Sequence, residues 1–270
     1  MAIALDAGFP KTTFKNNATG ATITSPAFTV GGNVRTLVLV YTEYSTGADV
    51  WPISCAWVGG TPAAATAWVL RAWNSLGGYT TNNPNPTYTF TGDSTSGADA
   101  EATSNRHHTT RIFTATWNGT PASASAVVTR TGTDANTGIV SVYSLEGALT
   151  TFGTIGQHHS SGLEITNTTA QTMELPITAS ASDSIIIGGL YWGNATEAVT
   201  ANGSTTIDYQ NNDGGAQGVS VAFRLTGTTT ASTEYTLGIT SSQWAWGVVA
   251  IEVLASGGGR NPVAMGFILE

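Results

Sequence analysis

Charge is the property that this sequence has least of. Charged residues make up 10% of the 270 residues, against about 25% in an average globular protein. Lys11 and Lys15 are the only lysines, and the formal net charge is −8. Binding to nucleic acid by phosphate neutralisation needs a basic face. The composition therefore excludes that class of function, and we predict no nucleic-acid partner.

Cysteine and long apolar runs are scarce as well. Cys55 is the only cysteine, so no intrachain disulfide can form. Its neighbours Ile53, Ala56 and Trp57 are apolar, which predicts a small buried side chain. No stretch of about 20 apolar residues occurs, so we expect no membrane span. The first residues have neither a basic start nor a long apolar run, so we expect no signal peptide.

These absences bear on where the protein is found. A chain of extracellular-style composition without an export signal is expected to be made in a cytoplasm and to reach the outside by another route. Assembly into a virus particle, followed by lysis, is one such route and predicts a location on the virion surface. Removal of a signal segment is the alternative, and it predicts an extracellular protein.

Helix signals are nearly absent, whereas β-branched runs recur along the chain between clusters of Gly, Asn, Pro and Asp. This spacing predicts an all-β protein built as an antiparallel β-sandwich. The runs at 185–187 and 248–251 are too continuous for a strand with one solvent face, so we expect them to be covered on both sides. Strands are expected at 36–44, 53–58, 68–73, 111–117, 124–130, 138–145, 173–178, 184–192, 205–209, 218–225, 235–240 and 246–254.

A three-part pattern occurs twice. In the first copy Asn118-Gly119-Thr120 precedes the strands at 126–131 and 138–145, and in the second Thr226-Gly227-Thr228 precedes those at 234–240 and 247–254. The offset is 108 residues at the first glycine and 109 at the last. This echo favours two related sheet units.

The predicted organisation follows from composition. The sequence predicts a polar N-terminal arm at 1–20, a sandwich domain at 21–255 with halves at about 21–150 and 151–255, a long loop at 77–110, and a glycine linker with a docking tail at 256–270.

The tail is the first candidate binding element. Its apolar residues alternate, so an extended segment presents them on one face: Val263, Met265, Phe267 and Leu269. We expect this segment to add as a β-strand to the open sheet edge of a neighbouring subunit. The alternative is that the tail folds back over its own sandwich.

Motifs for catalysis or metal binding are missing or incomplete. No nucleophile motif, phosphate loop or zinc-protease helix occurs, so we predict a protein that is not an enzyme and has no cofactor. Paired carboxylates of a glycan-degrading enzyme are a third alternative, because such pairing is spatial. The pairs His107–His108 and His158–His159 are poor chelators, because strand neighbours point to opposite faces. Asp134-Ala-Asn136-Thr-Gly138 begins like a calcium loop but has Leu145 where the distal acid belongs, so no metal site is predicted.

Aromatic residues give the second candidate binding element. The chain has eight tryptophans. Trp244 and Trp246 share a strand face by their spacing, and Trp192 ends a predicted strand. Exposed aromatics on a flat β face can stack on sugar rings, so Trp192, Trp244 and Trp246 are candidate glycan-binding residues. Burial in the core is the alternative for tryptophans of this kind.

Several segments together resemble a known type of domain. They are Gly31-Gly32-Asn33-Val34-Arg35 with the strand that follows, Val58-Gly59-Gly60, 140–147, Ser184-Ile185-Ile186-Ile187 and 242–251. The order is similar to that in jelly-roll-like β-sandwich domains of phage virion proteins and bacterial surface proteins, in which an Asn-Arg-x-Leu strand opens the domain and a Trp-containing strand closes it. Here Val34 stands between Asn33 and Arg35. The resemblance spans roughly residues 25–255, implies a fold and a setting, and supplies no catalytic residues.

The expected function is that of a virion structural protein, a head decoration or fibre component that binds other virion proteins. Low-charge, Thr/Ser-rich β domains hide their sheet edges by closed symmetry, so a homo-oligomer is expected, with a trimer favoured. The alternative is a receptor- or carbohydrate-binding surface module with a glycan as its partner.

Overall fold

The computed structural model describes residues 3–18, 20–32, 34–45, 53–77, 87–94, 107–130, 136–159, 171–192, 199–200, 205–212, 219–226, 232–239 and 246–256. Within these ranges every regular element is a β-strand, and neighbouring strands pair antiparallel. The expected all-β sandwich is confirmed. No helix in the described ranges is long and apolar enough to cross a membrane.

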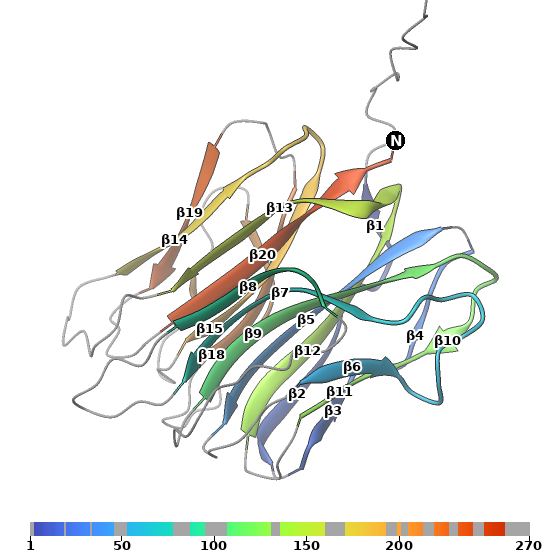
Figure 1. Ribbon diagram of the computed structural model, residues 1–270, viewed down its shortest axis with the longest axis horizontal. Helices are drawn as coiled ribbons and strands as arrows, with labels where there is room; N and C mark the ends of the chain where they lie inside the picture. Colours follow the sequence, from blue (N-terminus) through green and yellow to red (C-terminus); the bar gives the residue numbers. More distant parts are fainter. Residues whose placement is uncertain are drawn as a thin grey trace, which may run out of the picture.

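The strands up to Glu146 form one large sheet and two small ones (Figure 1). In order, the large sheet contains β2 (Lys11–Ala18), β12 (Asn136–Glu146), β5 (Arg35–Ser45), β9 (His107–Trp117), β7 (Val69–Gly77) and β8 (Thr87–Ser94), and β1 (Ala4–Leu5) also pairs with β12. The small sheets are β3 (Thr22–Thr24), β11 (Ala126–Thr129) and β6 (Ser54–Trp57), and β10 (Ser123–Ala124) with β4 (Phe28–Thr29).

The strands from Ala148 onward form a second pair of sheets. The five-stranded sheet contains β13 (Ala148–His159), β20 (Trp246–Ala255), β15 (Ile185–Trp192), β18 (Val219–Leu225) and β17 (Thr205–Asn212). The three-stranded sheet contains β14 (Gln171–Thr178), β19 (Ser232–Ile239) and β16 (Val199–Thr200). We call the two halves the first and the second sandwich.

The two sandwiches have the same strand order. The series β2-β12-β5-β9-β7 in the first large sheet corresponds to β13-β20-β15-β18-β17 in the second, and β3-β11-β6 corresponds to β14-β19-β16. The strands of the sequence echo occupy matching places, since β11 corresponds to β19 and β12 to β20. In the last strand the structural register differs from the echo by one residue. The echo's offset of 109 would match Val142, which packs inside the first sandwich, with Ile251, which packs between the large sheets, whereas an offset of 108 matches it with Ala250 inside the second sandwich. Two units with this shared order are what an internal duplication produces.

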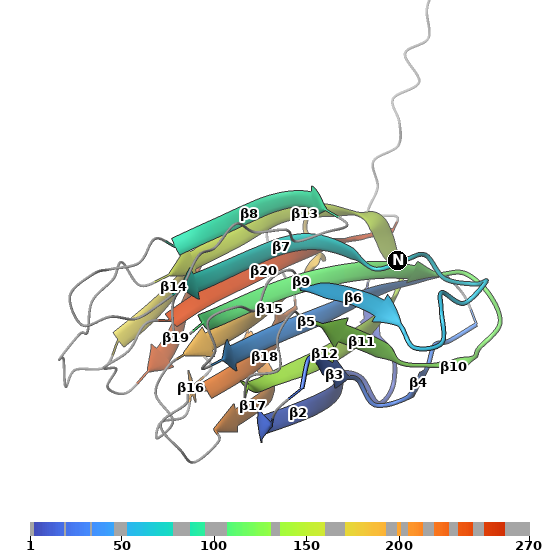
Figure 2. The same cartoon turned by 60° about the horizontal axis from the view of Figure 1, so that its bottom comes forward.

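The sheets stack in four layers, with the two large sheets in the middle (Figures 1 and 2). Three apolar cores fill the spaces between the layers. The first lies inside the first sandwich and includes Leu39, Trp57 and Trp117, and the second lies inside the second sandwich and includes Leu190 and Phe223.

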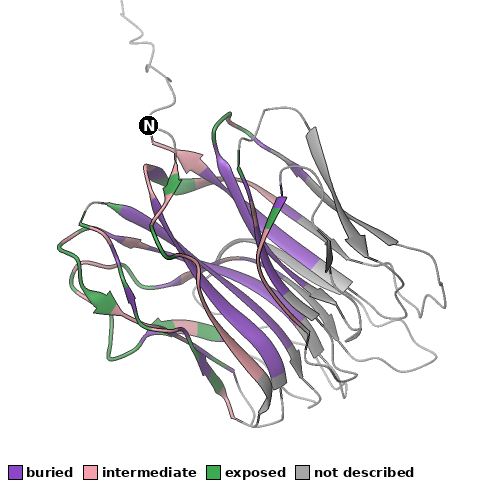
Figure 3. Ribbon diagram, turned by 180° about the vertical axis from the view of Figure 1, so that it is seen from behind, coloured by how far each residue is buried: buried purple, intermediate pink, exposed green. Residues whose placement is uncertain are grey.

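The third core lies between the two large sheets, and we call it the seam. Its buried residues are Val38, Val40, Ala72, Ile112, Ile139, Tyr143, Leu145, Ala148, Ile185, Ile187, Ala222, Val249, Ile251 and Val253. Strand β5 therefore buries both of its faces, with Leu39 in one core and Val38 in the other. Buried residues accordingly follow the central strands of both large sheets (Figure 3). This double coverage is what continuous apolar runs such as 185–187 predicted.

A single residue joins the two sandwiches. Gly147, between β12 and β13, has a φ of 71°, a left-handed conformation that suits glycine. Its carbonyl oxygen accepts hydrogen bonds from the backbone N–H of Ser256 at 2.6 Å and from the Ser256 hydroxyl at 2.8 Å. The junction is thus tied to the end of β20.

Three segments differ from what the sequence predicted. Residues 1–20 are not a polar arm, since they contain β1 and β2, and residues 77–110 contain β8 and the start of β9. The strand β13, which includes His158 and His159, was not predicted at all. The strands β2, β8 and β13 lie at sheet edges and are rich in Thr, Asn and Gly, and an edge strand needs no apolar alternation to stay paired.

The burial of both faces of the first large sheet predicts how substitutions on each face affect stability. Val38→Thr on the seam face and Val142→Thr on the opposite face of the large sheet should each lower the free energy of unfolding by about 1–3 kcal/mol, because each buries a hydroxyl among apolar side chains. Val58→Thr, at a site 54% exposed, is the control and should change it by less than about 0.5 kcal/mol. Urea unfolding measures the free energy of unfolding of all three variants. If Val38→Thr leaves it unchanged, the new hydroxyl is not buried among apolar side chains in the seam.

Candidate functional site

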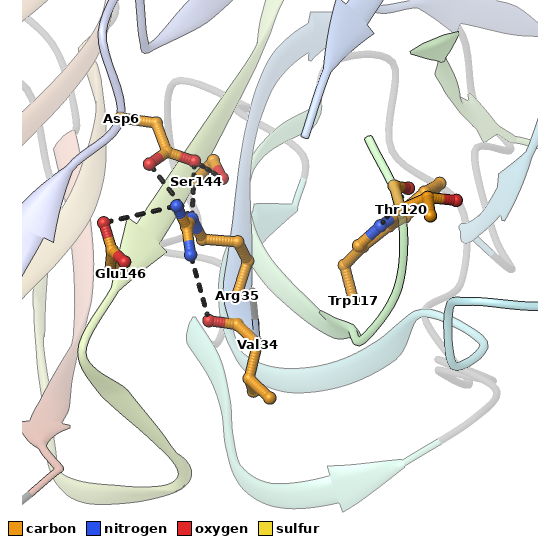
Figure 4. A network of polar contacts seen from close by, with 7 residues as sticks. All are labelled: Asp6, Val34, Arg35, Trp117, Thr120, Ser144 and Glu146. Atoms are coloured by element: carbon orange, nitrogen blue, oxygen red, sulfur yellow. Dashed lines mark hydrogen bonds and ion pairs between the residues drawn. The ribbon is translucent and has the colours of Figure 1, made fainter. Parts of the chain in front are cut away.

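Arg35 binds three chain segments at the start of β5 (Figure 4). Its Nε donates to both carboxylate oxygens of Asp6, at 3.0 and 2.9 Å, and its Nη2 lies 3.2 Å from Glu146 Oε2. The hydroxyl of Ser144 also donates to Asp6, at 2.6 Å. Arg35 is 6% exposed, so this cluster is a buried anchor that ties the N-terminal segment to β5 and β12.

Glu252 on β20 holds a comparable place in the second sandwich. Its carboxylate is buried and accepts hydrogen bonds from the backbone N–H groups of Thr154, Ser180 and Ala181. The hydroxyls of Thr154, Ser180 and Ser184 also donate to it. Burial alone would raise the pKa of Glu252, but the donated hydrogen bonds outweigh it and lower the pKa from 4.5 to about 2. The carboxylate is therefore ionised and fixes the turn before β15.

A third polar cluster lies inside the first sandwich, near the end of β5. Arg130 Nε lies 3.1 Å from Glu43 Oε1, with both side chains about 1% exposed. The Tyr41 hydroxyl donates to the other oxygen of Glu43. Burial, and next the nearby Glu43 carboxylate, hold the pKa of Tyr41 well above its usual range. The neighbouring Lys15 amine donates to Gly20 O at 2.7 Å, and burial followed by Arg130 lowers its pKa.

The fourth cluster connects the two sandwiches across the seam. The Tyr143 hydroxyl, from β12, donates to Asp208 Oδ2 on β17 at 3.1 Å. Arg224 Nη1, from β18, lies 3.3 Å from Asp208 Oδ1. Burial raises the pKa of Asp208, and Arg224 and Tyr143 only partly oppose that rise. The carboxyl group of Asp208 is therefore buried where β12, β17 and β18 meet.

These four clusters have one thing in common. Each carboxylate in them accepts hydrogen bonds or an ion pair from another chain segment, which is the chemistry of structural anchoring. The carboxylates of Asp6 and Glu146 both form ion pairs with Arg35. In the part of the chain that the structure describes, no group of three His, Cys, Asp or Glu side chains could hold a metal ion.

The predicted glycan-binding residues are brought together in part. The backbones of Trp192 and Trp246 are direct partners in the β15–β20 ladder. Trp244 lies outside the described residues. The docking-tail residues Val263, Met265, Phe267 and Leu269 also lie outside them.

The polar anchors were missed at the sequence level. The sequence patterns predicted no role for Asp208 or Glu252, and none for Arg35 beyond its place in the opening strand. Their partners are distant along the chain, such as Tyr143 for Asp208 and Ser180 for Glu252. One usable signal was present, because an acid inside the apolar run at 246–254 demands hydrogen-bond donors.

Comparisons of the chain with protein-family models, with curated proteins and with solved structures found no significant match to any of them.

The lowered pKa of Glu252 predicts a stability difference that depends on pH. Glu252→Gln should lower the free energy of unfolding by about 2–3 kcal/mol at pH 7, because an amide cannot accept all of the hydrogen bonds. The wild-type advantage is present above pH 4.5 and should disappear as pH falls towards about 2. Thermal unfolding between pH 2 and 7 measures the gap, and a gap that does not change with pH would contradict the assignment.

The raised pKa of Asp208 predicts the opposite slope. A carboxyl with a raised pKa in the fold stabilises most below its unfolded pKa of about 3.9, and that contribution is lost as pH rises through the folded value. The stability of the wild type relative to Asp208→Asn should therefore fall between pH 3 and 7. Parallel unfolding curves at each pH test this, and a wild-type advantage that grows with pH would refute it.

Proposed function

We propose that the protein is a non-enzymatic structural component of a virus particle, a head decoration or fibre protein that binds neighbouring subunits. The observation that carries the proposal is the use of the buried charges. Arg35, Glu43, Asp208 and Glu252 each join separate chain segments. Their side chains are engaged within the chain, which is the use expected of structural anchors.

The strand order supports the jelly-roll-like part of the proposal. In each sandwich the first strand pairs with the last, the last with the third, and the second with the next to last of the eight corresponding strands. This crossing between two sheets is what a jelly roll of two Greek keys requires. Domains of this kind present broad faces and strand edges, which suit contacts with other proteins.

The edges of the sheets offer places for such contacts. In the described part of the chain, β8 pairs only with β7, and β17 pairs only with β18. Unpaired backbone groups at such edges can accept an added strand. The alternating apolar tail at 256–270 has the pattern of a strand that would be added, which gives the proposal a defined donor.

Binding of a glycan is the second candidate function. The observation that favours it is the direct pairing of Trp192 with Trp246 in the ladder. Directly paired positions of a ladder lie on the same face of a sheet, so the register places both tryptophan positions on one face. Titration with oligosaccharides, followed by tryptophan fluorescence, tests this candidate. A response lost in Trp192→Ala and Trp246→Ala supports it, and no response to any glycan argues against it.

The proposed assembly role predicts a defined oligomer. Light scattering of the purified chain should give three times the mass of the 27.8 kDa chain, and the protein should be found on the surface of purified particles. A stable monomer at high concentration, together with absence from particles, would contradict the proposal.

The tail has a separate test. Deleting 257–270 should leave the melting temperature of the monomer unchanged but abolish assembly. The variant in which Val263, Met265, Phe267 and Leu269 become Ser should behave in the same way, whereas Ala264→Ser, at an interleaved position, is the matched control and should assemble. Unchanged assembly after deletion would overturn the docking role, and a large loss of monomer stability would show that the tail covers its own sandwich.

A further inference from the structure

Equivalent positions of the two sandwiches meet at the centre of the seam. In the first large sheet Val40 pairs with Ser141 on one side and Ile112 on the other. In the second, Gly189 pairs with Val249 and Ala222. Ile112 pairs with Ala72, directly after the bulge of β7. Ala222 pairs with Tyr209, directly after the bulge of β17. These matching bulges fix the register, so Gly189 holds the place of Val40. A Cβ at Gly189 would lie 2.5 Å from Val40 Cγ1, so the two equivalent residues face each other.

Equivalent bulges lie on the two sides of this centre. The register of β7 shifts between Leu70 and Ala72, and that of β17 shifts between Ile207 and Tyr209. The extra residues are Arg71 and Asp208, since β7 corresponds to β17.

Each bulged residue reaches across the seam to the other sandwich. Arg71 lies over the ring of Phe152 on β13, with its guanidinium carbon 4.9 Å from the ring centroid. Asp208 accepts the hydrogen bond of Tyr143 on β12. Bulges change the direction of side chains. The bulge of β7 directs a cation, Arg71, towards β13, and the bulge of β17 directs an acid, Asp208, towards β12.

We infer that the seam face of the large sheet is a pairing surface whose partner is a second copy of the same sandwich. A residue meets its own equivalent only on a two-fold axis, so the two sandwiches are related as the subunits of an isologous dimer. The inference extends beyond the proposed function, because it holds whatever the protein binds.

The side chains at Val40 and Gly189 favour pairing of a first sandwich with a second one over pairing of two identical sandwiches. Two copies of the first sandwich would place Val40 against Val40, where the structure has room for a glycine alone. Two copies of the second would place Gly189 against Gly189 and leave a gap. Overpacking and cavities both destabilise a core, so the valine–glycine pair selects one first and one second sandwich. The chain thus closes its own pairing surface, and other molecules must use its outer sheets and edges.

A double-mutant cycle in the full chain tests the valine–glycine pair. Gly189→Ala and Val40→Ala should each lower the melting temperature by about 3–8 °C, the first by overpacking and the second by a cavity. The double variant should lose clearly less than the two losses together, because Val40→Ala removes the nearest of the three side-chain atoms that the new methyl group meets, the other two being Cγ2 of Thr110 and of Thr42. If Gly189→Ala alone does not fold, recovery of folding in the double variant is the supporting result.

The matched control uses a valine on the other face of the same sheet. Val140 is buried in the core of the first sandwich, so Val140→Ala combined with Gly189→Ala should give additive losses. Additive losses in both double variants would overturn the inference.

Cleavage of the folded chain tests the choice of partner. A protease site inserted after Gly147 allows the two sandwiches to be separated covalently while both remain folded. In the variant that lacks 257–270, which is expected to be monomeric, the cut protein should still elute with the mass of one uncut chain, since the seam holds it. When cut samples with differently labelled first sandwiches are mixed, labels should never occur together in one particle. Separation upon cleavage, or particles that contain both labels, would overturn the inference.

Discussion

The packing of the two large sheets against each other is the interaction on which the rest of the structure depends. It requires β5, β9, β15 and β20 to place apolar side chains on both faces, since each lies between two cores. The one-residue junction at Gly147 is compatible with this packing because the sandwiches never need to separate.

The two sandwiches hold the segment before their central strand with different side chains. At the start of β5, Arg35 binds Asp6, and Ser144 donates to the same carboxylate. At the start of β15, Ser184 donates to Glu252, which holds the place of Ser144 in the last strand. In both cases a buried carboxylate fixes the segment that enters the central strand. Burial without such donors would cost several kcal/mol per charge, so each anchor is compatible only with its own surroundings.

The sequence predicted the central strands well and the edges poorly, for a physical reason. A strand covered on both faces can be continuously apolar, so runs such as 185–187 and 248–251 are recognisable without any partner. Edge strands such as β2 and β13 owe their pairing to a neighbour, and their Thr, Gly and Asn residues look like loop. The partners of Asp208 and the pairing of Trp192 with Trp246 depend on topology, which local patterns do not contain. Gly189 could not be recognised either, because its role is defined by Val40 in the other sandwich.

Differential scanning calorimetry of the full chain tests the central claim most directly. If the seam binds the two sandwiches into one body, unfolding is a single transition in which the calorimetric and van't Hoff enthalpies agree. Hydrogen exchange in the same sample should then give the slowest amides of β5 and β15 the same protection. Two resolved transitions, with one sandwich still folded after the other has melted, would contradict the account.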